Sequence, residues 1–169
     1  MWSFICMAEP VFRKWEMSKK NSVKTCLQYH FQQTWHANID TGSKTLKYRL
    51  FKNKFESENY FNILDDRDIF TFSRFRLNNH KLPIEYGRWN NIPRELRICN
   101  LCNRADLGDE FHYLLKCDYF SEKRKTYIDK KYLKNCNILK FGTLMNQTKN
   151  LCIFTRYINE HVCPHGWKM

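Results

Sequence analysis

Hydrophobic residues recur at helical spacing along most of the chain. The clearest run predicts a helix over residues 23–38, where every fourth position is apolar or aromatic: Val23, Leu27, Phe31 and Trp35. Similar spacing predicts a short helix over residues 58–64 and further helices over residues 67–78, 118–133, 138–146 and 151–161. We therefore expect a mostly α fold, a small helical domain around an aromatic core.

Polar and conformationally restricted segments divide these helices. The polar residues 18–22 predict a solvated break, so residues 1–22 are expected to be a poorly defined N-terminal segment. Residues 81–90 are expected to form an ordered loop, because Pro83 fixes the backbone there and Gly87 permits a turn.

Two adjacent aspartates, Asp65 and Asp66, precede the helix expected over residues 67–78. A polymerase pair of carboxylates would have an aromatic residue two positions earlier and strands on either side, whereas Ile63 stands here. One of the two aspartates is therefore expected to cap the helix, where its side chain accepts a backbone N–H at the positive end of the dipole.

The candidate chemistry is concentrated in one short stretch. Cys99 and Cys102 are separated by two residues, so both sulfurs can lie on one tight turn and point the same way. His112 and Cys117 follow in a segment expected to be the first turns of a helix. Zinc prefers four such ligands in a tetrahedron at about 2.0–2.3 Å. The order and spacing predict a closed, structural zinc site of the Cys-Cys-His-Cys (CCHC) type, a zinc knuckle inserted into the helical domain.

Other interpretations of these residues fit less well. A redox Cys-x-x-Cys pair is expected after a strand in a βαβ pattern, which is absent here. A zinc deaminase places a His-x-Glu before its Cys-x-x-Cys, and nothing similar precedes Cys99. The alternative interpretation, in which the three cysteines and the histidine are core residues that bind no metal, is left open by the sequence. His161, Cys163 and His165 lack a fourth ligand, so a second metal site is not expected.

These observations divide the chain into four parts. They are an N-terminal segment (residues 1–22), a basic and aromatic helical region (23–96), the CCHC zinc knuckle (97–120), and the C-terminal helices and tail (121–169). At 169 residues the chain is one domain, or one domain with a small zinc-stabilised appendage.

The chain is strongly basic, with 29 lysines and arginines against 17 acidic residues and a net charge of +12. Such an excess favours phosphate backbones or anionic membranes as partners, and interleaved aromatic residues and arginines favour nucleic acid, either RNA or DNA. The basic residues 44–55 are either a phosphate-tracking stripe or a solvated helix face. The candidate phosphate contacts are Lys44, Lys47, Arg49, Lys52, Arg74, Arg76, Arg88, Lys123 and Arg124, and the candidate stacking platform is Trp89.

The chain lacks the signals of a secreted or membrane protein. Its apolar opening, residues 1–8, is short, and its nearest cations follow it instead of preceding it. No stretch approaches the roughly 18 apolar residues of a membrane span. We therefore expect an intracellular protein of the nucleus or cytoplasm, with its eight cysteines mostly reduced or bound to metal and with no membrane partner.

Three segments together resemble the C-terminal region of reverse transcriptase polyproteins from non-LTR (LINE-type) retrotransposons. They are Phe72-Ser-Arg-Phe-Arg-Leu-Asn-Asn-His-Lys-Leu-Pro-Ile-Glu-Tyr-Gly-Arg88, Arg97-Ile-Cys-x-x-Cys102 and Asp109-Glu-Phe-His-Tyr-Leu-Leu-Lys-Cys117, and the resemblance covers residues 25–160. Cys99, Cys102, His112 and Cys117 match the four metal positions of the family. The recurrent motif before them is matched by Arg74, Arg76, His80, Glu85, Gly87 and Arg88, and the acid two before the histidine by Glu110.

The resemblance implies a zinc module that binds the element's RNA or the target DNA. The chain contains no endonuclease, polymerase fingers or catalytic carboxylates of that family, so the resemblance implies a binding module without catalytic activity of its own. A zinc-stabilised protein–protein interaction module with a basic surface remains the alternative. The sequence leaves open the strand preference, the oligomeric state, and whether the chain is a truncated element, a wrongly assembled gene or a host-adopted fragment.

Overall fold

The computed structural model describes residues 8–42 and 47–163, with side chains described from Lys19 onward. The chain divides into two units, Met1–Gly42 and Ser43–Met169. Most described residues are helical, and among them there is no β-strand, only an isolated antiparallel bridge between Ile98 and Leu107. The expected mostly α fold class is confirmed. No helix in the described ranges combines the length and the apolar character needed to cross a membrane.

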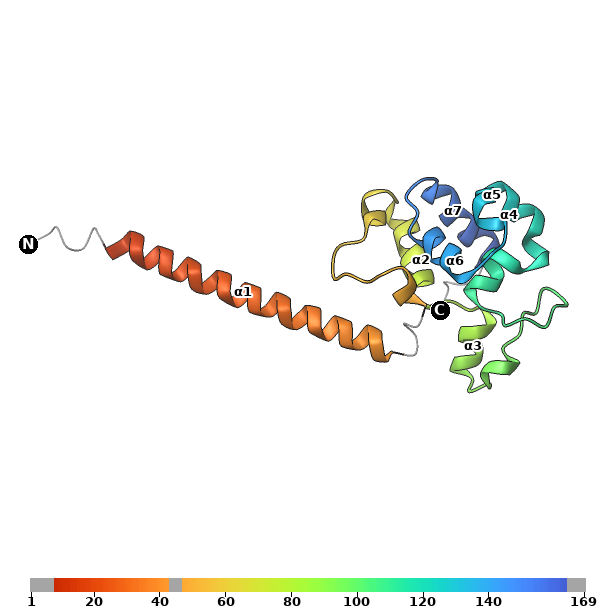
Figure 1. Cartoon of the computed structure of the whole chain (residues 1–169), viewed down its shortest axis with the longest axis horizontal. Coiled ribbons are helices and arrows are strands. Elements are labelled where there is room, and N and C mark those ends of the chain that lie inside the picture. Colours follow the sequence, from red (N-terminus) through yellow and green to blue (C-terminus); the bar gives the residue numbers. More distant parts are fainter. Residues whose placement is uncertain (1–7, 43–46, 164–169) are drawn as a thin grey trace, which may run out of the picture. The chain divides into compact units, whose positions relative to one another are not determined.

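The first unit is built on one long helix, α1, which spans Ala8–Thr41 over 34 residues (Figure 1). The helix predicted over residues 23–38 is confirmed as part of it. The break predicted over residues 18–22 is wrong, because those residues include neither glycine nor proline and the helix continues through them. The hydroxyl groups of Thr25 and Thr34 donate to carbonyls one turn earlier, at 2.8 and 2.9 Å, so these polar residues are accommodated within the helix.

The second unit is a group of short helices. The α-helices are α2 (Asp66–Arg76), α3 (Pro83–Trp89), α4 (Ser121–Tyr127), α5 (Lys130–Leu133), α6 (Ile138–Met145) and α7 (Leu151–Tyr157). Turns of 3₁₀-helix lie at Tyr48–Leu50, Asn59–Asn62, Arg94–Leu96 and Asp118–Phe120, and π-helical turns at His112–Lys116 and Ile158–Val162.

Helix α7 lies among the other helices of the second unit and packs against α2 and α4 (Figure 1). Its Phe154 and Tyr157 side chains are fully buried. Phe72 of α2 meets Phe154 edge-on with ring centroids 6.1 Å apart, and Phe120 meets Tyr157 in the same way at 6.3 Å. Buried aromatic rings contribute large apolar areas and specific edge contacts. Through Phe120, the segment that follows Cys117 is anchored in this core.

Helix α2 begins as predicted. The Oδ1 atom of Asp65 accepts the backbone N–H of Asp68 at 2.8 Å, so Asp65 is the N-cap. At the start of α6, Asn137 accepts the backbone N–H of Lys140 at 2.9 Å in the same manner. Both side chains satisfy N–H groups that the first turn of a helix leaves unpaired.

Two predicted elements differ from the structure. Residues 81–90 are not a loop, because α3 occupies most of them and Pro83 stands in its first turn, where a missing N–H has no cost. The helix predicted over residues 118–133 is divided into a 3₁₀ turn, α4 and α5. The division falls at Ile128, which adopts an extended conformation (φ −121°, ψ 130°) and has a buried side chain.

Candidate metal centre

The first two cysteines lie in a loop over residues 97–108 that folds back on itself. The backbone N–H of Cys99 donates to the carbonyl of Asp106 at 2.9 Å and joins the two arms. The chain reverses near Ala105, whose φ of 53° lies in the left-handed region. Inside the loop, the N–H of Leu101 donates to the Sγ atom of Cys99 at 3.4 Å. The backbone itself therefore orients the first sulfur.

The other two ligands are placed by a helical turn. Asp109 caps this turn, its Oδ1 atom accepting the N–H of His112 at 2.8 Å. The turn His112–Lys116 is π-helical, and a hydrogen bond of 2.7 Å joins the N–H of Cys117 to the carbonyl of His112. This closure over five residues brings Cys117 back beneath His112.

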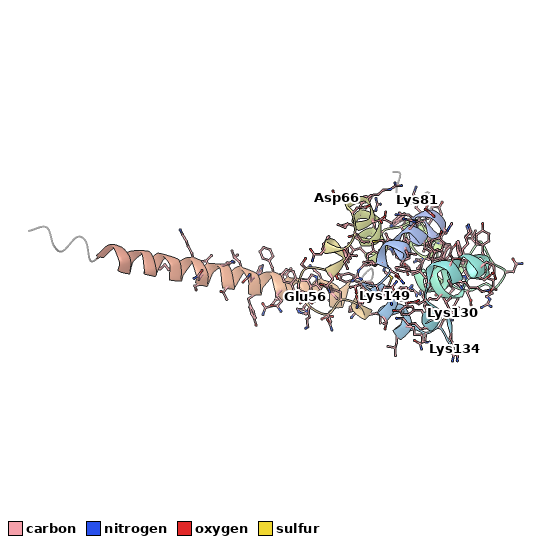
Figure 2. The ribbon with its side chains drawn as sticks, turned by 90° about the horizontal axis from the view of Figure 1, so that it is seen from above. Glu56, Asp66, Lys81, Lys130, Lys134 and Lys149 are labelled. Carbon is pink, nitrogen blue, oxygen red and sulfur yellow. The ribbon has the colours of Figure 1, made fainter. Side chains whose placement is uncertain are left out.

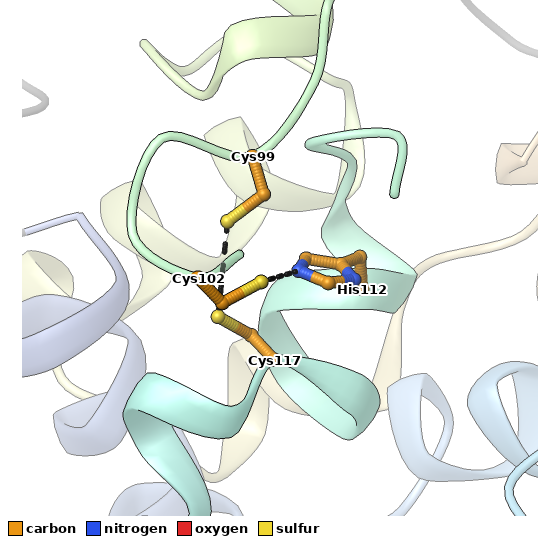
Figure 3. Close-up of side chains that lie close together, drawn as sticks. All are labelled: Cys99, Cys102, His112 and Cys117. Carbon is orange, nitrogen blue, oxygen red and sulfur yellow. Dashed lines mark hydrogen bonds between the residues drawn. The ribbon is translucent and has the colours of Figure 1, made fainter. Parts of the chain in front are cut away.

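The four side chains converge on one point, two from the loop and two from the helical turn (Figure 3). Their ligand atoms all lie within 4.8 Å of one another. The Sγ atoms of Cys99 and Cys117 are 3.8 Å apart, and the Sγ atom of Cys102 is 3.3 Å from Nε2 of His112. A tetrahedron with metal–sulfur bonds of about 2.3 Å has edges of about 3.8 Å, so the cluster has the size of a four-coordinate site. A Cys-Cys-His-Cys cluster that can hold a metal ion is therefore present.

The cluster is largely shielded from solvent. Cys99, His112 and Cys117 expose 4%, 2% and 0% of their surface, and Cys102 is half-buried. Burial lowers the pKa of His112, which keeps its imidazole neutral and leaves Nε2 able to bind a metal. The histidine is thus held in the protonation state that coordination requires.

The thiols differ in how readily they ionise without a metal. Burial raises the pKa of Cys99, but hydrogen bonds to its sulfur, chiefly from the backbone N–H groups of Leu101 and Cys102, outweigh burial, and the net effect lowers the pKa. For Cys117 burial dominates and raises the pKa to about 12. Because a bound cation deprotonates the thiols that coordinate it, metal binding at this site releases protons and weakens as the pH falls.

The second ring nitrogen of His112 faces Asp106. The Oδ2 atom of Asp106 lies 3.4 Å from Nδ1 of His112, and this buried nitrogen has no hydrogen-bond partner. Histidines that bind metals commonly donate their other N–H to a carboxylate, which fixes the tautomer and the ring orientation. Sequence reasoning missed Asp106, although it is an acidic residue inside the loop that separates Cys102 from His112.

A buried charged network ties the helical turn to distant parts of the domain. The Oε1 atom of Glu110 lies 2.8 Å from Nε2 of His80, and its other oxygen pairs with Lys47. The Nζ atom of Lys47 is also 2.7 Å from Asp109. Burial would raise the pKa of Glu110, but the hydrogen bond from His80 and the charge of Lys47 outweigh it and hold the pKa at about 2. Glu110 is therefore ionised in the folded protein.

The motif before the knuckle also makes internal contacts. Arg88 forms an ion pair with Glu85, one turn earlier in α3. At Gly87, an added Cβ would lie 2.5 Å from Cγ of Arg97, so only glycine fits without displacing that side chain. The Nε atom of Arg97 donates to the carbonyl of Ile92 at 2.8 Å. This close approach sets α3 beside the first arm of the cysteine loop.

Some of the candidate nucleic-acid contacts have accessible side chains and others are buried. Those with exposed or half-buried side chains are Lys47, Arg49, Arg74, Arg88, Trp89 and Lys123. Lys47 is engaged in the charged network described above. Trp89 is 47% exposed at the end of α3. Lys44 lies outside the described residues.

Arg76 and Lys52, two of the predicted phosphate contacts, are buried and bound to internal partners. Arg76 is 2% exposed, donates to both carboxylate oxygens of Glu58 at 3.2 Å, and places its guanidinium 4.4 Å from the ring centroid of Phe51. Lys52 is 8% exposed and donates to the carbonyl of Glu56 at 2.6 Å. A cation committed to such internal partners is not available to a phosphate.

Arg124, another of the predicted phosphate contacts, is also buried. It is 7% exposed and donates to the carbonyls of Leu115 and Cys117 at 3.0 and 2.6 Å. These carbonyls lie at the end of the π-helical turn, where a helix leaves acceptors unpaired. Arg124 therefore holds α4 against the turn that carries two of the metal ligands.

Within the described ranges, the four residues at the knuckle are the one group of three or more potential metal ligands. His161 lies near Lys123, with its Nδ1 atom 3.2 Å from that ammonium, and Cys163 is buried. His165 lies outside the described residues. No protein-family model, curated protein or solved structure matches the chain.

Proposed function

We propose that this chain is a nucleic-acid-binding zinc module without catalytic activity of its own, as its resemblance to the C-terminal region of non-LTR retrotransposon reverse transcriptases implies. Cys99, Cys102, His112 and Cys117 would hold one Zn²⁺. Four protein ligands complete a tetrahedral site and leave no position for water or substrate, which is the mark of structural zinc. The ion joins the cysteine loop to the helical turn and so fixes the surface around them.

The observation that carries the proposal is the set of exposed lysines between residues 116 and 149. Seven lysines of this stretch are exposed, against three acidic residues: the lysines are Lys116, Lys123, Lys125, Lys130, Lys131, Lys134 and Lys149. In Figure 2, Lys130, Lys134, Lys149 and Glu56 lie toward one side of the domain and Asp66 and Lys81 toward the other. A local excess of exposed lysines over carboxylates is the electrostatic pattern expected of a surface that follows a phosphate backbone.

A groove lies within this lysine-rich stretch. It has a volume of about 470 Å³, and its lining includes Lys125, Lys130 and Lys131 together with Tyr127 and Ile153. Lysines and an aromatic ring are the groups that contact phosphates and bases in single-stranded nucleic acids. The groove therefore replaces the buried Lys52, Arg76 and Arg124 as the candidate contact surface.

Binding assays on the zinc-loaded chain test the proposal. Labelled structured RNA, single-stranded DNA and duplex DNA are each titrated at several salt concentrations. We expect binding whose log–log salt slope is about −0.7 to −0.9 per phosphate contact. Lys125→Gln with Lys130→Gln should weaken binding to all sequences alike and reduce the slope by up to about two.

The matched control is Lys54→Gln with Arg67→Gln, which removes two exposed cations outside the groove. It should change affinity and slope less than the groove variant. Unrelated nucleic acid should displace the bound probe, because contacts to phosphates do not depend on sequence. If none of the three nucleic acids binds, the proposal is wrong and the protein–protein interaction module is favoured.

A further inference from the structure

Helix α1 carries a surface that the proposed function does not use. The apolar side chains of Val23, Leu27 and Phe31 are 59%, 50% and 57% exposed. Because they stand four residues apart, successive side chains advance only about 40° around the helix and form one stripe. The stripe lies in a shallow groove of about 480 Å³, whose lining is completed by Lys19, Lys20, Lys24 and Gln28.

The groove gathers all the positive charge of its part of the helix. Residues 19–39 contain three lysines and no aspartate or glutamate, and all three lysines line the groove. Lys20 and Lys24 lie within about 60° of Leu27 around the helix. The opposite face carries uncharged residues such as Thr25 and Gln32. Apolar and cationic side chains thus occupy the same face.

Such a stripe contributes to stability only when another surface covers it. Most of the stability of a protein helix comes from packing an apolar face, not from intrinsic propensity. From Lys19 to Thr34 every described side chain of α1 is exposed. Amphipathic helices commonly dock such stripes in helix-to-helix contacts with anchors one turn apart.

We propose that this face of α1 docks an acidic amphipathic helix of a partner protein. The apolar side chains of the partner helix cover Val23, Leu27 and Phe31. Its flanking glutamates or aspartates pair with Lys20 and Lys24, which sets the orientation and speeds association. The positive charge of the groove is the feature that selects an acidic partner.

The same charges argue against two other occupants. A second copy of the chain would bring three further lysines and, over residues 19–39, no carboxylate to meet them. An anionic membrane is usually bound by helices whose polar face is rich in lysine and arginine. Here the face opposite Leu27 is uncharged, with Ser22, Thr25, Tyr29 and Gln32.

Fluorescence anisotropy with the full chain tests the proposal. The probe is a labelled helical peptide of about 20 residues, with leucines at every fourth position and glutamates on both sides of them. A peptide of the same composition in scrambled order is the comparison. We expect the ordered peptide to bind and Leu27→Gln to weaken it about tenfold or more, because truncating a central anchor has the largest effect. Tyr29→Gln, which changes a 63% exposed aromatic residue on the opposite face, should leave binding unchanged.

Charge reversal adds a second, independent readout. Lys20→Glu with Lys24→Glu should abolish binding of the acidic peptide, and a peptide with lysines in place of its glutamates should bind this variant. Circular dichroism checks that α1 remains helical in each variant. Equal binding of ordered and scrambled peptides, or no effect of Leu27→Gln, overturns the proposal.

Two further measurements exclude the other occupants. Binding to vesicles containing phosphatidylserine that is lost in Leu27→Gln, without peptide binding, would assign the face to a membrane and overturn the proposal. Sedimentation showing self-association that is lost in Leu27→Gln would assign it to a second copy, with the same consequence. Nucleic-acid affinity should be unchanged in Leu27→Gln, so a failure here is distinct from a failure of the proposed function.

Discussion

The Nε2 atom of His80 lies 2.8 Å from the Oε1 atom of Glu110, and this contact joins segments 30 residues apart in the chain. Both side chains are buried, and Lys47 completes the network from a third segment. Glu110 stands two residues before the candidate metal ligand His112. The turn that bears this ligand is therefore fastened to the helical domain by charge as well as by apolar packing.

Glu110→Gln is expected to lower the free energy of unfolding by about 3 kcal/mol, because the neutral amide removes the buried negative charge that pairs with Lys47 and keeps only one of the two acceptor oxygens that His80 and Lys47 share. Urea unfolding at neutral pH measures the change. Glu122→Gln removes an exposed carboxylate that pairs with Lys125 and should stay within about 0.5 kcal/mol of the wild type. Similar effects of the two variants would contradict a structural role for the buried network.

Cys102→Ser is expected to abolish tight zinc binding and to unfold at least residues 97–120, because structural zinc contributes on the order of 10 kcal/mol or more to small modules. Metal analysis should find one zinc per wild-type chain and none in the variant. Cys152→Ser, an exposed cysteine outside the cluster, should retain the metal. A wild-type chain without zinc would refute the assignment.

Asp106→Asn is expected to weaken zinc binding about 10–100-fold, because it removes the carboxylate that faces Nδ1 of His112. Competition with a chelator measures the affinity. Asp118→Asn is the control, since it removes an exposed carboxylate beside the cluster that pairs with Arg104. If both variants bind zinc equally well, Asp106 does not orient the histidine.

Trp89→Ala is expected to weaken binding to single strands with little change in the salt slope, since stacking is worth about 1–3 kcal/mol per base and releases few counterions. Its indole is half-exposed at the end of α3, so the melting temperature should change little. Binding and stability are measured on the same variant. A destabilised variant that loses single-stranded and duplex binding equally would assign Trp89 to packing.

Gly87→Ala is expected to destabilise the domain by about 1–3 kcal/mol, because the new Cβ overlaps the stem of Arg97. Combining it with Arg97→Ala should cost less than the sum of the two single changes, since the double variant removes the overlap. Urea unfolding of the four proteins gives the coupling energy. Strict additivity would show that the two residues do not meet.

Most of the successful predictions rested on patterns among residues that are close together in the sequence. The four residues of the Cys-Cys-His-Cys cluster were found because two short spacings and a helical turn bring them together, and these are local features of the sequence. A cap at Asp65 or Asp66 was expected for the same reason, and the structure assigns it to Asp65. No comparable sequence pattern predicted that the turn would be π-helical. The segment from Glu110 to Cys117 was expected to be helical, but its residue types do not distinguish an α-helical from a π-helical turn.

Contacts between distant segments could not be predicted. Lys47 and Glu110 are 63 residues apart, and nothing in either segment indicates that they meet. The burial of Arg76 did have a local signal, because it stands one helical turn after the core residue Phe72 and therefore lies on the inner face of α2. Because isolated cations are almost never buried, the positive charge of Arg76 led us to expect an exposed side chain there.

The π-helical turn also has a consequence for the length of the two spacers on either side of His112. One of them tolerates an inserted residue and the other does not. Residues five apart in an α-helix differ by about 140° around the axis, so an α-helical turn would point His112 and Cys117 in different directions. The spacer between them is therefore fixed by backbone geometry, and adding or removing one residue there breaks the site. The spacer from Cys102 to His112 passes through the exposed residues 103–105, where an insertion lengthens only the loop. Among divergent copies of such a module, the spacer between His112 and Cys117 should keep its length, while the spacer between Cys102 and His112 should vary.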